Sequence, residues 1–507
     1  MTGAQPAPDR SQWRRLHPRM LVVQPLHEFV RALPILVATF LVGAGSGSGS
    51  GEKWSLVVSV LAVLLGPVRW YTTQFRIADG KVQLRRGVLQ QQVTTVPLER
   101  IRSVDVTAHP LHRVLGLARV EIGTGSRDTK SKNEDRLKLD ALTVAQAHRL
   151  RSELFLAGAP RSGHAELARA RTTWMRYAPL NIGGPVLLGL IAVILHQAHV
   201  DPWDTAPAHA LAARLRGPDP WGGIAEAALV ALVCATVAST LFYAVMFGDF
   251  RLVRLPDGTL QTTHGLLTTR TVTLQESRVR GVEVAETLPV RAVGGARCLA
   301  LTTGLRGSRG GALLVPSAPA EQVRQVAAEV IRDPAPVHGP LKPHPRRALR
   351  RRLVRALVSG TVVAALFAVA TARGTLPDWP WPLVVALFPL GVLLALDGYR
   401  GLGHTLAGPY LVGQLGVLVR RRWALSRDGV VGLRLRRSVF QRRAGLVTVI
   451  ATTAAGRGRY FLLDITSEDA VRIALEVMPE AVEPFVEAPS PVEDTSASTG
   501  TRSAGAG

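Results

Sequence analysis

The residue types that usually carry catalysis do not gather into a recognisable site along this chain of 507 residues. It lacks the zinc-binding pattern His-Glu-x-x-His, the phosphate-cradling pattern Gly-x-x-x-x-Gly-Lys and a Gly-x-Ser-x-Gly nucleophile on a strand–helix turn. His109 and His112 are three residues apart, but no third ligand stands near them, which favours a surface turn over a metal site. We therefore expect no enzyme activity, no metal, no cofactor and no small-molecule substrate.

The strongest local chemical signal is a run of arginines ahead of an apolar segment. Its members are Arg346, Arg347, Arg350, Arg351 and Arg352, which fall within about two helical turns and can reach one surface together. Such clusters attract anionic lipid at about 1 kcal/mol per basic residue. They also fix the orientation of the segment that follows, and the two roles are compatible. Nucleic acid is disfavoured as a partner, because aromatic residues make up only 5% of the chain and lipid is the nearer polyanion.

Apolar residues are concentrated in six segments, each near the length that crosses a bilayer as a helix. They run over residues 29–46, 54–70, 178–195, 226–247, 356–372 and 379–396. A single such segment fits a buried helix equally well, but six arranged in pairs favour membrane spans. The first also has arginines ahead of it, as a signal peptide does, although no small-residue cleavage site follows.

The charges predict how these spans are oriented. The formal net charge is +24, yet the loops between paired spans, 46–53, 196–223 and 372–378, hold four basic and five acidic residues. Positive charge collects on the cytoplasmic side of membrane proteins. We therefore predict a multi-pass protein of the cell membrane with both termini in the cytoplasm. Its two cysteines, Cys234 and Cys298, form no disulfide framework, which suits a reducing compartment.

Three soluble blocks follow the three pairs of spans and resemble one another. An offset of 178 residues relates Gly87 to Gly265 and Gly116 to Gly294, and an offset of 329 relates Gly87 to Gly416. A fixed offset of this length indicates whole domains that repeat. The repeat-motif residues, assigned a structural role, are Gly87, Arg100, Gly116, Gly265, Arg278, Gly294, Gly416, Arg442 and Gly445.

Within each block, alternating apolar and polar residues predict about seven strands, and a helix with one apolar face ends the block. The predicted boundaries are a basic arm 1–28, span pair 29–70, first block 71–160, span pair 178–247, second block 248–333, a Pro/Arg-rich linker 334–355, span pair 356–399, third block 408–479 and a disordered tail 480–507.

The phrase Pro97-Leu98-Glu99-Arg100-Ile101-Arg102-Ser103-Val104, together with Asp79-Gly80, Gly87-Val88-Leu89 and Leu115-Gly116-Leu117-Ala118, resembles the bacterial membrane PH-like family (YdbS/YdbT-like). The similarity extends from about Leu16 to Met478 and departs at Gln275-Glu276, where Pro-Leu would stand. It implies that each transmembrane hairpin is followed by a PH-like β-sandwich or barrel with a C-terminal capping helix. It implies no enzyme activity.

We therefore expect a membrane scaffold or binding protein that presents three cytoplasmic PH-like domains to protein, peptide or anionic-lipid partners. The loop from Gly123 to Asp135 is a candidate contact surface, and a smaller two-span protein of the same family is a candidate partner. The alternative is a component of an antimicrobial-peptide export or resistance system, and an enzyme is the third possibility. Ionisable residues stand near span ends rather than span centres, which argues against an ion-coupled carrier.

Overall fold

The computed structural model describes residues 13–15, 71, 74–78, 81–86, 92–97, 103–108, 115–123, 136–143, 146, 165–181, 183–197, 205–216, 220–303, 311–376 and 380–485. The first predicted span pair, the histidines at 109 and 112, Gly87, Arg100 and nearly all of the 123–135 loop lie outside these residues.

Strands and short helices recur in one order through the described residues. The first block contains β2 (Gln74–Ala78), β3 (Lys81–Arg86), β4 (Gln92–Pro97), β5 (Ser103–Ala108), β6 (Leu117–Gly123) and β7 (Arg136–Thr143), with β1 (Arg14–Arg15) paired to β2. The second contains β9 (Arg251–Arg254), β10 (Thr259–His264), β11 (Thr269–Gln275), η3 (Glu276–Arg278), β12 (Val279–Thr287), α8 (Leu288–Ala292), β13 (Gly295–Thr302), β14 (Ala312–Pro319) and α9 (Ala320–Ile331), with β8 (Ala165–Arg169) paired to β9. The third contains β15 (Gly403–Ala407), β16 (Tyr410–Leu415), β17 (Val419–Ser426), η4 (Arg427–Gly429), β18 (Val430–Arg436), α13 (Val439–Arg443), β19 (Leu446–Thr453), β20 (Arg459–Thr466) and α14 (Ser467–Val477).

Each of the last two blocks is a two-layer unit with its own core. In the second, β9–β11 face β12–β14, and α9 packs Val323, Val326 and Val330 into the space between them, as its helical spacing predicts. In the third, β15–β17 face β18–β20, and Trp423 and Tyr460 stack at a centroid distance of 5.1 Å inside that core. The predicted terminal helix of these blocks is therefore present and closes the layers.

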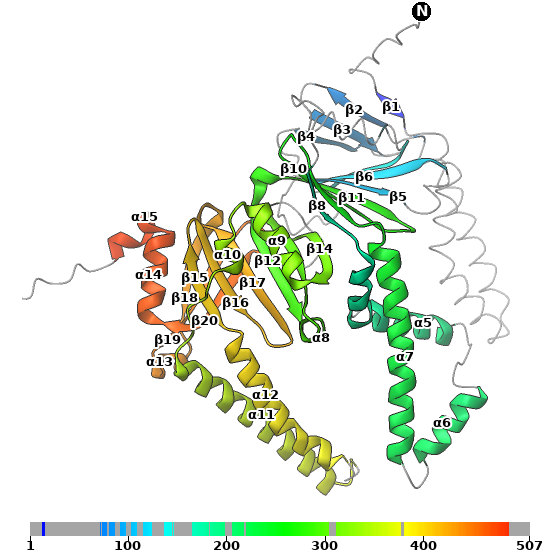
Figure 1. The fold of residues 1–507 in the computed structure, drawn as a ribbon, viewed down its shortest axis with the longest axis vertical. Helices are drawn as coiled ribbons and strands as arrows, with labels where there is room; N and C mark the ends of the chain where they lie inside the picture. Colours follow the sequence, from blue (N-terminus) through cyan, green and yellow to red (C-terminus); the bar gives the residue numbers. More distant parts are fainter. Residues whose placement is uncertain are drawn as a thin grey trace, which may run out of the picture.

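The sheets extend across block boundaries, which the sequence did not predict. One seven-stranded sheet has the order β7-β6-β5-β11-β10-β9-β8, and one six-stranded sheet has the order β14-β13-β12-β17-β16-β15. The second half of one block and the first half of the next thus share a continuous sheet (Figure 1). The two remaining sheets, β1-β2-β3-β4 and β18-β19-β20, stand at the two ends of the series.

The repeat-motif glycines hold backbone conformations that other residues adopt only under strain. Gly116, Gly294 and Gly445 have φ of 68°, 71° and 67°, while Gly265 and Gly416 have φ of 106° and 119°. A Cβ on Gly265 would lie 2.1 Å from the carbonyl oxygen of Thr268, and one on Gly416 would lie 1.9 Å from that of Val419. Glycine is therefore required at these turns.

Three described helices are long and apolar enough to cross a membrane: α7 (Pro220–Phe247), α11 (Arg346–Ala372) and α12 (Trp381–Arg400). The predicted span at 178–195 is instead the bent pair η2 (Thr172–Leu180) and α5 (Gly183–Gln197), which meet at 56° and raise the count to four if read as one span. Pro179 interrupts hydrogen bonding at this bend. The loop before α7 contains α6 (Ala206–Arg216). α5–α7 and the α11–α12 hairpin extend from the same side of the sheets (Figure 1).

The predicted Pro/Arg-rich linker and the predicted disordered tail are both partly helical. The linker at 334–355 contains α10 (Ala335–His338) and the first ten residues of α11, because arginine favours helix and Pro345 stands at the N-cap. The tail, predicted to be disordered from residue 480, begins within α15 (Pro479–Val482) and η5 (Glu483–Phe485).

Candidate functional site

Two equivalent junctions join the blocks, and their strand registers are identical. In the first, β5 pairs with β11 so that Ser103 faces Leu274. In the second, β12 pairs with β17 so that Gly281 faces Leu425. The offset of 178 relates Ser103 to Gly281, and an offset of 151 relates Leu274 to Leu425. A one-residue slip would turn every side chain to the other face, so the shared register marks one repeated interface.

A buried acid and an arginine from the neighbouring block recur at both junctions. Asp105 lies 3.2 Å from Arg270, and Glu283 lies 3.5 Å from Arg421. The acids are 4% and 1% exposed, and each pair occupies the same repeat positions. Arg457 approaches Glu283 to 3.3 Å from the third block. Burial raises the pKa of Glu283, although the arginines oppose that rise.

A second ionic contact joins the second junction to the end of α12, one of the membrane-length helices. Asp397, in the last turn of α12, lies 2.8 Å from Arg291 of α8 and 3.0 Å from Arg420 of β17. A single carboxylate thus bridges the second block, the third block and the helix that carries it. The arginine at 291 is the repeat counterpart of Arg442, whereas Arg442 itself is exposed at the end of α13.

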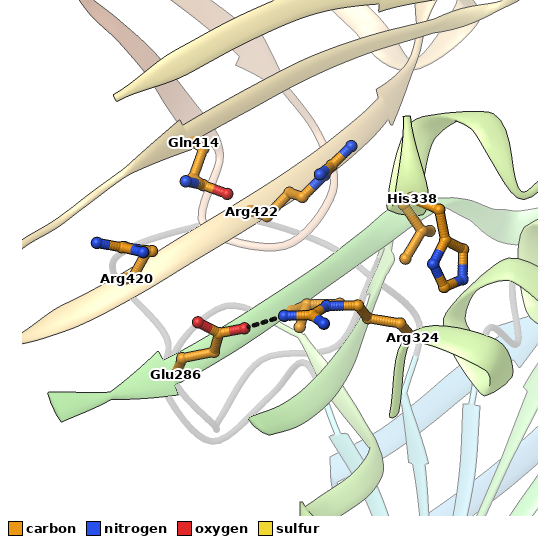
Figure 2. A pocket seen from close by; sticks show the side chains of 8 residues that line it. Glu286, Arg324, His338, Gln414, Arg420 and Arg422 are labelled. Atoms are coloured by element: carbon orange, nitrogen blue, oxygen red, sulfur yellow. Dashed lines mark hydrogen bonds and ion pairs between the residues drawn. The ribbon is translucent and has the colours of Figure 1, made fainter. Parts of the chain in front are cut away.

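A polar cavity of about 220 Å³ lies at the same junction, between β12, β16, β17, α9 and α10 (Figure 2). Figure 2 shows Glu286 joined to Arg324, with Arg420, Arg422, Gln414 and His338 around them. Arg422 donates to the carbonyl oxygens of Pro336 and Gly339 at 3.0 and 2.6 Å, and burial lowers its pKa to about 10. Each arginine that lines this cavity already has an acceptor within the chain. We therefore assign the cavity a structural role in the junction and not a role in ligand binding.

In the second block the repeated Gly-x-Leu segment is Gly265-Leu266-Leu267, and it forms a loop that packs on the end of the membrane-length helix α7. The amides of Gly265 and Leu266 donate to the carbonyls of Gly248 and Val245, at 2.8 and 2.9 Å. A Cβ on Gly248 would lie 2.3 Å from Leu266, which shows how closely the leucine covers this helix end. The next residue, Leu267, is 56% exposed.

The third block builds the same loop at α12. Val417 covers Gly398 in the last turn of α12, where an added Cβ would lie 2.7 Å from its methyl carbon. Leu418, the counterpart of Leu267, is 63% exposed and accepts a hydrogen bond from the amide of Leu288. Each loop therefore packs its second residue on the helix and presents a leucine outward beside the helix end.

The structure divides the predicted arginine cluster into two groups. Arg346, Arg347 and Arg350 are exposed at the start of α11. Arg351 pairs with Asp464, and Arg352 is only 7% exposed. The first three remain free to reach an anionic surface, whereas the last two hold α11 against the third block.

An apolar pair lies close to the exposed arginines. Val439 and Phe440 of α13 are 66% and 73% exposed. Gln441 donates to Asp464, the same carboxylate that receives Arg351, so α13 is fastened beside the start of α11 (Figure 1). Exposed apolar side chains rimmed by arginine are typical of surfaces that meet lipid.

A buried histidine pair is not suited to acid–base chemistry near neutral pH. Among the described residues, His344 and His404 stack edge to face at 5.0 Å and are 6% and 2% exposed. Burial lowers the pKa of each to about 4. The pair is thus neutral at physiological pH and serves packing. No group of three or more metal-ligating side chains converges among the described residues.

Two of these residues could have been predicted from a signal in the sequence. The offset of 178 residues relates Asp105 to Glu283, and an acid at the same position of two copies indicates a buried ionic position. Asp397 carried no such signal, because only its place at the end of α12 gives it two arginine partners.

Two-layer β units set on membrane-length helices define the class of protein to which this chain belongs. Residues 31–157 and 356–483 match the family described as bacterial PH domain. The two ranges cover just over half of the chain, which therefore belongs to this family. No curated protein and no solved structure matches the chain.

Proposed function

We propose that this protein is a multi-pass membrane scaffold that holds three PH-like units against the cytoplasmic face of the membrane and presents them to protein, peptide or anionic-lipid partners. The observation that carries the proposal is the pair of Gly-x-Leu loops, which seat on the ends of α7 and α12 and expose Leu267 and Leu418 beside them. An apolar side chain next to the end of a spanning helix meets the headgroup and acyl boundary, where its burial is favourable.

The second block, 248–333, lies outside the two matched ranges, and its membership as a third PH-like unit is part of the proposal. Its support is the fixed offset, the shared glycine conformations and the shared junction register. The proposal also places a third pair of spans at residues 29–70 ahead of the first block.

Charge supports contact with anionic lipid. Arg346, Arg347 and Arg350 are exposed at the start of α11, and Arg442 and Arg443 are exposed on α13 together with Val439 and Phe440, at the same end of the third block (Figure 1). Each arginine near an anionic surface contributes about 1 kcal/mol, and an inserted apolar side chain adds to this. The same basic residues favour a cytoplasmic position for this face.

The distribution of charge within the helices favours a scaffold over a transporter. In the described spanning helices, ionisable side chains stand at Glu226, Asp397, Arg400 and the first ten residues of α11. Asp397 forms ion pairs with two arginines of the proposed cytoplasmic units. A carrier usually holds such groups along its path through the bilayer.

The proposed orientation is tested by cysteine labelling in intact cells, with Cys234 replaced by alanine. Asp219→Cys and Thr375→Cys, in the loops between paired spans, should react with a membrane-impermeant maleimide. Pro256→Cys and Pro409→Cys, which replace exposed residues of the second and third blocks, should react only after the cells are opened. Labelling of either proline-site variant from outside would contradict the cytoplasmic placement.

A further inference from the structure

Strand β18 has the position of a junction strand, yet its junction side is open. The offsets of 178 and 151 relate β5 to β12 and β12 to β18. β5 and β12 each pair on both sides, with β11 and β17 of the next block completing the sheets. Among the described residues, β18 pairs with β19 alone. A free edge offers unpaired amides and carbonyls to another strand.

The exposure of side chains on β18 also indicates that a neighbouring strand is missing. Leu435 is 49% exposed, whereas its counterparts Val106 and Val284 are 8% and 4% exposed inside the two junctions. The side-chain position that is exposed on β18 is therefore buried in both junctions, where a strand of the next block covers it.

The complementary edge is open at the other end of the chain. β4 is the counterpart of β11 and β17, and among the described residues it pairs with β3 alone. Val93 on β4 is 53% exposed, whereas its counterpart Thr271 is 7% exposed. Among the strands that the structure describes, the series of sheets thus ends in two edges of the kind that the internal junctions bring together.

We propose that β18 of one copy pairs antiparallel with β4 of a second copy, head to tail, and so extends the series of blocks from one molecule to the next. The register of both internal junctions then places Gly432 opposite Val96, Arg434 opposite Thr94 and Leu435 opposite Val93. The two exposed apolar side chains, Leu435 and Val93, cover each other in this register. Pairing of this kind supplies main-chain hydrogen bonds as well as apolar contact.

The charges make this edge selective. The acid of the internal junctions, Asp105 or Glu283, is replaced in β18 by Arg434. The arginine that it meets, Arg270 or Arg421, is replaced in β4 by Gln92. Arg434 would face an arginine if β18 paired with β11 or β17, and like charges at an interface are costly. Against β4 it meets a neutral amide.

The membrane permits this arrangement. The helices that follow successive blocks extend from the same side of the sheets (Figure 1). Repeating the junction therefore leaves the second copy in the same bilayer with the same orientation. Contacts of this head-to-tail type build rings or open chains. The inference rests on the proposed function only in placing both copies in one membrane, which the cysteine labelling above tests separately.

Disulfide cross-linking of the full-length protein in membranes tests the pairing. Two differently tagged copies are co-expressed in the Cys234→Ala background, one with Leu435→Cys and the other with Val93→Cys. Directly opposed residues of an antiparallel pair have Cβ atoms about 4.5–5.5 Å apart, within reach of a disulfide under mild oxidation. We expect a product that carries both tags and is at least ten times more abundant than the product from Leu435→Cys with Thr94→Cys. Thr94 neighbours Val93 but its side chain points to the other face of the strand.

Maleimide labelling of the unfolded protein should first show that both cysteines are present and reduced, because each is covered by the other in the paired state. Absence of the doubly tagged product would then overturn the proposal. A product that joins Leu435→Cys to a different protein, or equal cross-linking of the Val93 and Thr94 variants, would also overturn it. If both proteins are absent from the membrane fraction, the failure lies with the proposed function instead.

Discussion

Replacing Gly281 by valine should separate β12 from β17 and loosen the second junction while the two cores persist. Gly281 has a φ of 153°, and a Cβ there would lie 1.9 Å from the carbonyl oxygen of Ala424 on β17. Backbone strain of about 1–3 kcal/mol and overpacking of about 1–3 kcal/mol add at this position. We expect a loss on the order of 4 kcal/mol. Hydrogen exchange of the β17 amides, measured on a peptide covering 419–426, should accelerate by at least a hundredfold.

The chain supplies a matched control for this experiment. Gly432 is the counterpart of Gly281 in β18, and no atom lies within 4 Å of the Cβ that a substitution would add. Gly432→Val should leave exchange in β17 unchanged within a factor of three. Equal acceleration in both variants would show that the effect belongs to glycine loss in a strand and not to the junction.

Glu283→Ala should also weaken the second junction, for an electrostatic reason. The variant removes the carboxylate that faces Arg421 and Arg457, and these two arginine side chains, each 29% exposed, lose their counter-charge. Removing one member of a buried ionic group costs about 3–5 kcal/mol. The expected result is a lower midpoint of thermal unfolding in detergent for the second and third blocks, together with earlier proteolysis between them.

An exposed ion pair on the same block serves as the comparison for Glu283. Glu321 is 64% exposed and lies 3.9 Å from Arg324, so Glu321→Ala should change stability by less than about 1 kcal/mol. If Glu283→Ala behaved like Glu321→Ala, the buried acid would contribute nothing to joining the blocks.

Much of the local architecture follows from the sequence because local constraints encode it. Gly265 and Gly416 must stand at turns that no side chain permits, and they repeat at a fixed offset for that reason. The apolar face of α9 was likewise visible as Val323, Val326 and Val330 at helical spacing. Features that depend on a few consecutive residues were therefore predictable.

The pairing of blocks was not predictable in the same way. It depends on strands far apart in the chain, such as β5 with β11, whose compatibility shows only once their register is known. The arginine cluster was divided for a related reason, since Arg351 pairs with Asp464 outside its own helix and Arg352 is buried within the range of the same carboxylate. The bend between η2 and α5 reflects Pro179 within an otherwise apolar stretch.

The central claim is that the two-layer β units lie on the bilayer through the Gly-x-Leu loops, and depth-dependent fluorescence quenching tests it directly. Full-length protein with Cys234→Ala carries one environment-sensitive label, at Leu267→Cys or Leu418→Cys, in vesicles with nitroxide-bearing lipids. The controls, Pro256→Cys and Pro409→Cys, stand at the far ends of β10 and β16, and each strand of six residues spans about 20 Å. Leu232→Cys, 63% exposed on α7, reports the bilayer interior.

We predict that shallow nitroxides quench the labels at Leu267 and Leu418 several times more strongly than the labels at the two proline sites. Deep nitroxides should quench the label at Leu232. Quenching at the leucine loops no greater than at the proline sites, with Leu232 still quenched, would contradict the account of how the units are held, because the helices would then span the membrane while the loops stayed in water.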